Sequence, residues 1–453
     1  MRVALIQPKI PDGNYLPSLG LLYIASILGS RGFQVKVFDE NYKANFLKDL
    51  FLYDPDTVGF TCVTASINGC LRMASETKKS INAKIVFGGP HPTALPEKTV
   101  INESVDFVIV GEGEYPMLML CEAIKEGKDE RDFKDIPNLY YKSNGVVEKT
   151  RDTKFLTGEK LDALPYPAFH LLDLEYVFKN SRHGLFSMGK RILTIMTSRG
   201  CPQVCTFCCR IMGSHIRERS VSNVLEEIIF MKETYGIDEL YIEDDNFCHN
   251  KKRALEILDE IIKSNLGIYI KFANGLRADT VDKELLGKIK RAGGYWVGFG
   301  IESGSKKVLT LMKKNLDLGV TKQNVEIAKS TGLFVGSNLI VGYPGENEDD
   351  LKESLRYFKG LGLDSCAIVN LIPFPKTPVY ELCKKGGYLT KKAENYDNFY
   401  FRIFSPNVLI STPYLTGKEI RKHVRLFYLK FYLRPLRIYR LFKVFFKRFI
   451  SEG

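Results

Sequence analysis

The sequence predicts an α/β protein with two domains, an open doubly wound parallel sheet followed by a partial (β/α)6 barrel, and then a basic helical tail. Three observations predict it. Short apolar strands alternate with helical patterns from the start of the chain, the same rhythm returns near residue 191, and aromatic and basic residues dominate the end. We expect a first domain, a linker, a barrel and a tail with these boundaries: 1–140, 141–190, 191–400 and 401–453.

Five strands are expected in the first domain, with helical patterns such as residues 19–32 between them. The strands are 2–8, 34–40, 57–63, 83–89 and 105–114. Strands joined through helices run parallel, and ligands then bind beyond their carboxyl ends. The loops at those ends are rich in Gly, Pro and Ser, which allows close approach to a ligand. No G-x-G-x-x-G follows the first strand, so nicotinamide binding is disfavoured.

The second domain repeats the rhythm six times. Its expected strands are 192–197, 238–243, 268–274, 295–301, 333–341 and 365–371. A closed barrel needs eight such units. We therefore expect a partial barrel, open on one side, that can admit a large substrate.

Composition places the chain among cytoplasmic globular proteins. Hydrophobic residues make up 45% and charged residues 26% of the sequence, no export signal is recognised, and no uncharged apolar run is long enough to span a membrane. Ten cysteines without an export signal indicate reduced thiols rather than a disulfide framework.

Most of the positive charge lies in the tail. Residues 416–453 carry eleven Lys or Arg against two Glu, which is +9 of the chain's +12, and Pro435 should divide the helix. Three interpretations stay open: a helix that closes the barrel against solvent, an amphipathic segment at the inner face of the membrane, and a nucleic-acid surface. The closely spaced Phe residues disfavour nucleic acid.

Three cysteines follow the first barrel strand with the spacing C-x3-C-x2-C: Cys201, Cys205 and Cys208. Three thiolates on one loop can hold three corners of a cubane iron–sulfur cluster and leave the fourth iron open. Zinc with a distant fourth ligand is the alternative. Cys209 should point elsewhere, and six further cysteines are interpreted as small buried residues: Cys62, Cys70, Cys121, Cys248, Cys366 and Cys383.

This loop resembles that of the radical S-adenosylmethionine (SAM) superfamily, with Phe207 at its aromatic position. The barrel strands end in motifs that also resemble this family: "YIEDDNF", "NGLRAD", "GIESGS", "VGYPGE" and "PFPKTPVYE". The resemblance implies a [4Fe-4S] cluster on the three cysteines, and a SAM site made by Phe207, Asp244, Asp245, Arg277, Glu302 and Ser303. Plainer interpretations remain: a solvated cap for the Asp pair, an acid partner for the Arg, and a helix N-terminal charge for the Glu.

The first domain resembles the cobalamin-binding domain of the same branch, in "PSLGLLYIASIL", "FGGPHPTALPE" and "VIVGEGE". The resemblance implies cobalamin contacts from Ser18, Gly20, Ser66, Gly88, Gly89, His91, Gly111, Glu112 and Gly113. One departure is that the signature Asp-x-His-x-x-Gly, which supplies a cobalt-ligating His, is absent. A lone loop His is more often structural, and the domain could also be a fold that has lost its cofactor.

The resemblance implies a cobalamin-dependent radical SAM methyltransferase that moves a methyl group from methylcobalamin to an unactivated carbon, after a 5′-deoxyadenosyl radical abstracts hydrogen. The alternatives are a non-methylating radical reaction such as an oxidative cyclisation or ring rearrangement, a non-enzymatic cobalamin- or metal-binding protein, and a membrane or RNA adaptor. A methylthiotransferase is disfavoured because the first domain lacks that class's cysteine spacing. Expected partners are a small-molecule substrate, such as a lipid or other apolar natural product, and a one-electron reductant such as flavodoxin or ferredoxin.

Overall fold

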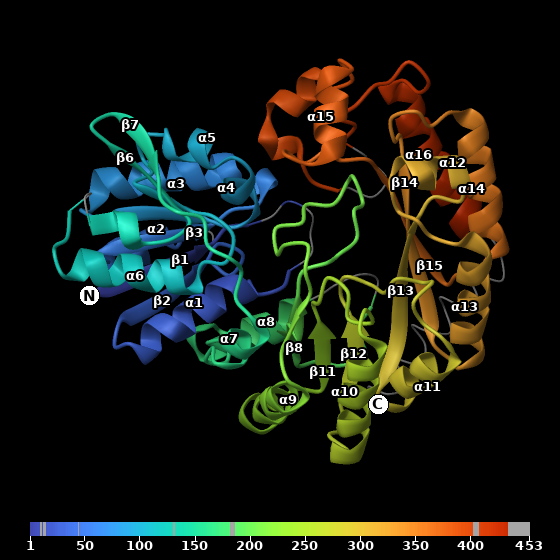
Figure 1. Cartoon of the computed structure of the whole chain (residues 1–453), viewed down its shortest axis with the longest axis horizontal. Helices are drawn as coiled ribbons and strands as arrows, with labels where there is room; N and C mark the ends of the chain where they lie inside the picture. The colour runs from blue at the N-terminus through green and yellow to red at the C-terminus, as the bar shows by residue number, and fades with distance from the viewer. Residues whose placement is uncertain are drawn as a thin grey trace. The chain divides into compact units, whose positions relative to one another are not determined.

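The structure is a computed structural model of the whole chain. It describes residues 1–433 except 10, 12–14, 44, 130–131, 182–185 and 402–406. The chain divides into two compact units (Figure 1). The first unit holds Met1–Gly184 and Cys209–Ser220, and the barrel unit holds Leu185–Cys208 and Val221–Gly453. The chain therefore leaves the barrel unit after Cys208 and re-enters it at Val221.

A seven-stranded sheet forms the centre of the first unit, in the order β2-β1-β3-β4-β5-β6-β7. Strands β1 to β5 pair in parallel, as predicted, whereas β6 and β7 add on as an antiparallel hairpin. The strands are β1 (Arg2–Gln7), β2 (Gln34–Asp39), β3 (Thr57–Thr61), β4 (Lys84–Gly88), β5 (Phe107–Ile109), β6 (Leu139–Ser143) and β7 (Val146–Lys149).

Helices connect these strands and bury their apolar sides; α1 packs on α6, and α2 on α3. They are α1 (Leu19–Ser30), α2 (Leu47–Tyr53), α3 (Ile67–Ser80), α4 (Pro90–Ala94), α5 (Pro96–Val100), α6 (Glu114–Lys125), α7 (Gly158–Asp162) and α8 (Leu174–Asn180).

The segment 141–190, predicted as a linker, instead contributes structure to the first unit. It supplies most of the β6–β7 hairpin and helices α7 and α8. The hairpin turns at Asn144 and Gly145, whose φ angles are 49° and 79°. Two successive left-handed residues make the tight turn that suits twisted strands, and an Asn-Gly pair adopts it readily. The prediction gave this pair no weight.

Six parallel strands form the partial barrel, in the order β15-β14-β13-β12-β11-β8. The predicted doubly wound sheet and partial barrel are thereby confirmed. The strands are β8 (Ile192–Ile195), β11 (Glu239–Ile242), β12 (Tyr269–Phe272), β13 (Gly294–Glu302), β14 (Phe334–Val341) and β15 (Ser365–Asn370), and two short strands are β9 (Ser198–Arg199) and β10 (Arg217–Glu218).

Helices α9, α10, α11 and α13 lie as successive neighbours outside the barrel strands (Figure 1). Several begin with a side-chain cap; Asn347 and Asp350 form a capping box at α14, for example. The helices are α9 (Val221–Tyr235), α10 (Lys251–Ser264), α11 (Lys283–Arg291), α12 (Lys306–Leu311), α13 (Leu318–Ser330), α14 (Glu348–Gly360), α15 (Pro378–Lys385) and α16 (Gly417–Tyr432).

Helix α16 covers the edge of the barrel sheet at β15. The Tyr428 hydroxyl accepts from the backbone N–H of Ile368 at 3.0 Å, and the Tyr432 hydroxyl accepts from that of Cys366, also at 3.0 Å. Two phenol groups thus satisfy edge donors that a further strand would otherwise pair. The described part of the tail packs on the barrel; residues 434–453, with Pro435 and the Phe-rich stretch, lie outside the described residues.

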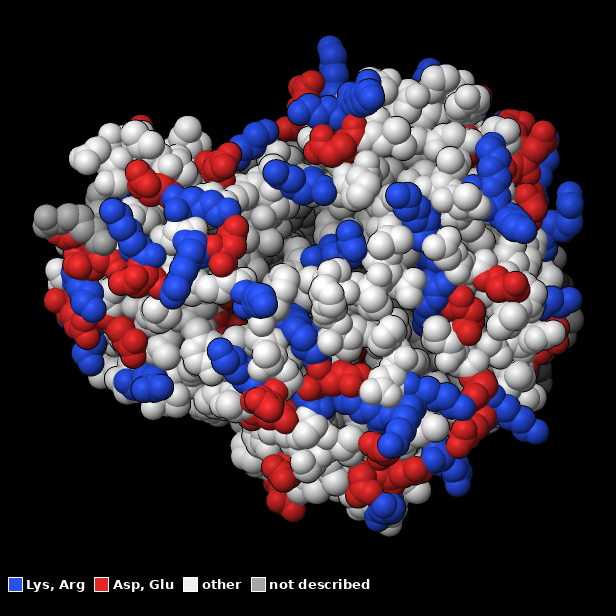
Figure 2. Space-filling model, viewed as in Figure 1, with Lys and Arg blue, Asp and Glu red and all other residues white. Residues whose placement is uncertain are grey.

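Charge on the two units is mixed. On the face shown in Figure 2, Lys and Arg side chains alternate with Asp and Glu rather than forming one large patch. This agrees with the sequence, in which residues 1–415 carry only +3 of the net charge. The six cysteines outside the cluster loop are buried, as predicted.

Candidate active site

The three spaced cysteines lie on one loop of the barrel unit, directly after β9. Cys201 is half-buried, Cys205 is buried and Cys208 is exposed, and all three are free thiols. A hydrogen bond from the Cys208 thiol lowers the pKa of Cys205 to about 6, whereas burial raises the pKa of Cys201. Among the described residues, no three His, Cys, Asp or Glu side chains could hold a single metal ion. The thiols of a cubane cluster each bind a different iron.

Thr206 anchors the middle of this loop to the barrel. Its backbone N–H donates to the Met312 carbonyl at 3.0 Å, and its own carbonyl accepts from Val379 N–H at 3.0 Å. Its Oγ1 lies 2.6 Å from the hydroxyl of Tyr343, which donates to the Leu311 carbonyl at 3.0 Å. The end of α12, the start of α15 and the loop after β14 therefore hold the backbone beside the thiols in place.

Two acidic residues that follow β11 accept hydrogen bonds from the chain segment that leads to the cysteine loop. Asp244 is buried, and its carboxylate accepts from Thr197 N, Thr197 Oγ1 and Ser198 Oγ, each at 2.6 Å. Burial raises the pKa of Asp244, and these hydrogen bonds oppose that rise. Asp245 is exposed and accepts from Gly200 N–H at 3.2 Å. The predicted pair is therefore divided: Asp244 holds the chain that leads to the loop, and Asp245 faces outward beside it.

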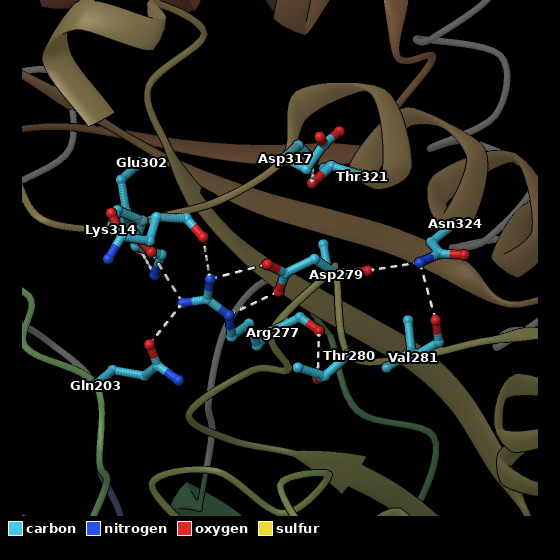
Figure 3. Close-up of polar contacts among 12 residues, drawn as sticks. Gln203, Arg277, Asp279, Thr280, Val281, Glu302, Lys314, Asp317, Thr321 and Asn324 are labelled. Carbon is cyan, nitrogen blue, oxygen red and sulfur yellow. Dashed lines mark hydrogen bonds and ion pairs between the residues drawn. The ribbon is translucent and has the colours of Figure 1, made fainter. Parts of the chain in front are cut away.

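Arg277 lies in a dense polar network (Figure 3). One terminal nitrogen, Nη1, donates to Gln203 Oε1 at 3.1 Å and to the Lys314 carbonyl at 2.9 Å. The other, Nη2, donates to Asp279 Oδ2 at 2.8 Å and to the Asn315 carbonyl at 2.5 Å, while Nε lies 2.6 Å from Asp279 Oδ1. A guanidinium has five N–H groups. The four N–H groups of the two terminal nitrogens all bond to protein oxygens, and Asp279 pairs with the guanidinium, which is the plainer interpretation of an acid partner for Arg277.

Glu302 and Lys314 form a long ion pair next to the cysteine loop. Glu302 ends β13 with a φ of 70°, a conformation unusual for a residue with a side chain. Lys314 Nζ lies 3.6 Å from Glu302 Oε1 and 5.9 Å from the Phe207 ring centroid. A side chain at Gly300 would approach both charged groups, to 3.0 and 3.2 Å. The ammonium group adds to the lowering of the Cys205 pKa and opposes the rise in the pKa values of Cys201 and Cys208.

Two residues here differ from what the sequence suggested. Ser303 is buried, with its Oγ 3.1 Å from Ser354 Oγ and accepting from Ser305 N–H at 3.1 Å. Lys314 was not among the residues predicted from the sequence. Its neighbour Lys313 is exposed, and in the sequence the two lysines are indistinguishable, so no local signal separates the one that faces the loop.

In the first unit, the candidate cobalamin residues gather at one edge of the sheet, in or beside loops at the carboxyl ends of parallel strands. The order β2-β1-β3-β4-β5 places a topological switch between β1 and β3, where ligands of such sheets bind. A side chain would fit at two of its glycines, since one at Gly20 would meet no atom within 4 Å and one at Gly88 none nearer than 3.8 Å, whereas one at Gly89 would come within 2.9 Å of Thr61 Oγ1. Positive φ values at Gly89 and Gly111 shape the loops after β4 and β5.

Three of these candidates are engaged within the protein. His91 is 3% exposed, its Nδ1 lies 3.4 Å from Thr64 Oγ1, and burial lowers its pKa to about 4. Ser66 is buried, with its hydroxyl bonded to the backbone three residues earlier. Glu112 pairs with Arg217 at 2.6 Å. His91 therefore matches the structural role considered for a lone loop His.

Comparison with known proteins gives two family matches, "Radical SAM superfamily" over residues 195–358 and "B12 binding domain" over residues 10–120. The chain is 30% identical, over 96% of its length and 93% of the relative, to the uncharacterized methyltransferase PH0819 of Pyrococcus horikoshii. It is 24% identical, over 94% of its length and 81% of the relative, to an anaerobic magnesium-protoporphyrin IX monomethyl ester cyclase of Rubrivivax gelatinosus. Its fold is similar to that of the radical SAM methyltransferase TsrM from Kitasatospora setae (TM-score 0.70, 19% identity, 86% of this chain and 76% of that one).

The barrel with its three-cysteine loop is thus the catalytic domain of a radical SAM enzyme. More particularly, the chain belongs to the cobalamin-dependent, methyltransferase-like branch of the radical SAM superfamily. The predicted cofactors, a [4Fe-4S] cluster, SAM and cobalamin, are confirmed at the level of these two domains. Three free thiols on one anchored loop beside a cation fit such a cluster. Among the described residues, no helix is both long and apolar enough to cross a membrane.

Proposed function

We propose that this enzyme transfers a methyl group to an unactivated carbon of its substrate. The observation that carries the proposal is that one chain combines an anchored three-thiol loop with a B12-binding domain, and matches a protein named as a methyltransferase over 96% of its length. In this proposal Cys201, Cys205 and Cys208 hold three irons of the cluster and leave the fourth for SAM. When bound, the cluster and cobalamin supply one-electron cleavage of SAM and a methyl carrier.

The described side chains divide the work of binding SAM. SAM carries a carboxylate and an ammonium group, so its site needs a cation and an anion near the cluster loop. We assign the carboxylate to Lys314 and the ammonium to Asp245, because Asp245 is exposed beside the loop and the ion pair between Lys314 and Glu302 is long, at 3.6 Å. Glu302 remains the candidate for the ribose. The polar atoms of Asp244 and Arg277 bond to protein groups, so we assign these two residues a positioning role. Asp244 holds the chain before the cysteine loop, and Arg277 holds the backbone of Lys314.

The test uses anaerobically reconstituted protein with hydroxocobalamin, a reductant and SAM. We expect formation of both 5′-deoxyadenosine and S-adenosylhomocysteine in wild-type protein, and loss of 5′-deoxyadenosine and of cluster iron in Cys205→Ala. Cys209→Ala is the matched control, because Cys209 is an exposed neighbour outside the spacing. Protein with a verified cluster and bound cobalamin that forms neither product, with extracts that contain candidate substrates, would contradict the proposal.

A non-methylating radical reaction is the second candidate, and the similarity to a cyclase over 94% of the chain favours it. It predicts 5′-deoxyadenosine without stoichiometric S-adenosylhomocysteine. We also propose a flavodoxin or ferredoxin as electron donor and an apolar natural product as substrate. Membrane contact through the basic tail, and cytoplasmic location, stay predictions.

A further inference from the structure

The segment from Cys209 to Ser220 has no role in the proposed function, yet its position in the chain is distinctive. It begins at the peptide bond that follows Cys208, the last of the three spaced thiols. By its contacts this segment belongs to the first unit, whereas the cysteine loop belongs to the barrel unit. We name residues 209–220 the strap. Any force that fixes the strap acts, through one peptide bond, on the loop that carries the thiols.

Arg217 fixes the strap to the loop after β5. Its Nη1 donates to Glu112 Oε1 at 2.6 Å and to the Leu156 carbonyl at 3.1 Å, and its Nη2 donates to the Met212 carbonyl at 2.6 Å. Glu112 also accepts, through Oε2, from Leu156 N–H at 2.7 Å. The Arg and Glu side chains are only 11% and 6% exposed. The Arg217 guanidinium also lies 4.7 Å from the centroid of the Phe155 ring.

Close packing continues along the strap. A side chain at Gly213 would come within 2.7 Å of the Phe155 ring, and one at Gly158 within 2.3 Å of the Glu218 carbonyl. Such approaches need glycine, so the chain is tightly fitted at both points. Further along, Ser220 N–H donates to both carboxylate oxygens of Asp162, at 3.0 and 3.1 Å. The strap is therefore held at several points. Arg217 contributes a largely buried ion pair, and the buried Arg219 donates to the Tyr23 hydroxyl at 3.4 Å.

Glu112 lies in "GEGE", one of the loops expected over cobalamin. Because both of its carboxylate oxygens bond to the strap and to the chain at residue 156, it acts here as a clamp. Removing one partner of a buried ion pair leaves the other charge unpaired, which is strongly destabilising. The folded state in which Arg217 and Glu112 are paired is therefore strongly favoured. A ligand that orders the loop after β5 would then order the strap as well.

We propose that Arg217 is a positioning residue that couples the cobalamin loop at Glu112 to the cluster loop, through the strap. The inference rests on the proposed function for the identity of the two cofactors. Linkage requires that the coupling be reciprocal: the cluster should tighten cobalamin binding by the factor by which cobalamin favours the cluster-bound state. The coupling should disappear when the Arg217–Glu112 contact is removed.

The experiment titrates hydroxocobalamin, followed by its absorption, into full-length protein with the reconstituted cluster and without it. We expect the cluster to lower the cobalamin Kd of wild-type protein by about fivefold or more, and by less than twofold in Arg217→Met. The electron paramagnetic resonance spectrum of the reduced cluster should also change on addition of cobalamin in wild-type protein, but not in this variant. Arg210→Met, which removes an exposed charge from the same strap, is the control and should behave as wild type.

Arg217→Lys and the double variant Arg217→Met/Glu112→Gln guard against misfolding. Lys keeps the charge for Glu112 and should retain part of the coupling, whereas the double variant should show no more loss than Arg217→Met alone. If Arg217→Met couples the two cofactors as wild type does, or if wild-type protein binds both cofactors independently, the inference is overturned. Wild-type protein that binds no cobalamin would instead contradict the proposed function.

Discussion

The two ends of the barrel each place a lysine among aromatic side chains, and they use it differently. At the amino-terminal end, Lys271 of β12 is buried, donates to the Phe186 carbonyl at 2.9 Å and lies 5.2 Å from the ring centroids of both Tyr241 and Trp296. At the carboxyl-terminal end, Lys314 has one acid at 3.6 Å and one ring at 5.9 Å.

The surroundings of the two lysines explain the difference. Glu239, the acid near Lys271, accepts from Met188 N–H at 2.8 Å and Gly189 N–H at 2.6 Å, and also from the Tyr295 hydroxyl. At this end, which we call the plug, both carboxylate oxygens of Glu239 accept hydrogen bonds from the protein. At the other end, the one ion pair that the described residues give Lys314 is longer, 3.6 Å to Glu302, and it lies beside three thiols. In barrels the carboxyl-terminal face carries the chemistry and the opposite face carries stability. A buried charged side chain therefore does not by itself indicate a binding site. A charged side chain with few protein partners, next to groups that can bind a ligand, does.

The largest effect is expected from removing the cation at the open end. Lys314→Met should weaken SAM binding to the cluster-containing protein about 10- to 100-fold, since a hydrogen bond to a charged group contributes about 1.5–3 kcal/mol. Lys313→Met is the matched control, because Lys313 is the exposed neighbour. Titration of SAM, followed through the cluster's spectrum, measures both. Equal affinities in the two variants would mean that Lys314 is no more part of the site than its neighbour.

The fold was largely predictable because its signals are local. Strand and helix periodicity, read within windows of a few residues, predicted the five parallel strands of the first sheet and the six of the barrel. The β6–β7 hairpin was missed although Asn144-Gly145 signals a turn, because its two strands are only five and four residues long. The division of the chain at Cys208 was not predictable, since it depends on contacts of the strap with residues far away in the sequence, such as Glu112.

The site was predictable only where the spacing of residues along the chain indicates the chemistry. The cysteine loop is defined by residues close together in the chain. For Asp244 and Arg277 the sequence gives the residue types, but their polar atoms are taken up by partners such as Ser198 and Gln203, which the sequence does not reveal. Lys314 was missed for the opposite reason: its importance comes entirely from where the chain folds it.

A smaller effect on SAM binding is expected at Arg277, which donates a hydrogen bond to the backbone carbonyl of Lys314. Arg277→Lys cannot reproduce four directed hydrogen bonds, so we expect the free energy of unfolding to fall by about 1–3 kcal/mol, as buried acceptors lose their donors. The affinity for SAM should change less than in Lys314→Met, and chemical denaturation together with the same SAM titration measures both quantities. A loss of SAM affinity as large as that of Lys314→Met, with unchanged stability, would restore Arg277 as a direct SAM contact.

The smallest effect is expected at the closed end and concerns stability alone. Burial lowers the pKa of Lys271 from 10.5 to about 8. Between these values the unfolded chain binds more protons than the folded one, so this residue's contribution to stability rises with pH from about 8 to about 10.5. At 1.36 kcal/mol per pKa unit, the gain from pH 7 to pH 9 is about 1 kcal/mol. Denaturation of wild type and Lys271→Met at both pH values should show this gain only in the wild type, with SAM affinity unchanged. Identical pH dependence in the two proteins would mean that the plug does not hold Lys271 away from water, and the contrast between the two ends of the barrel would then fail.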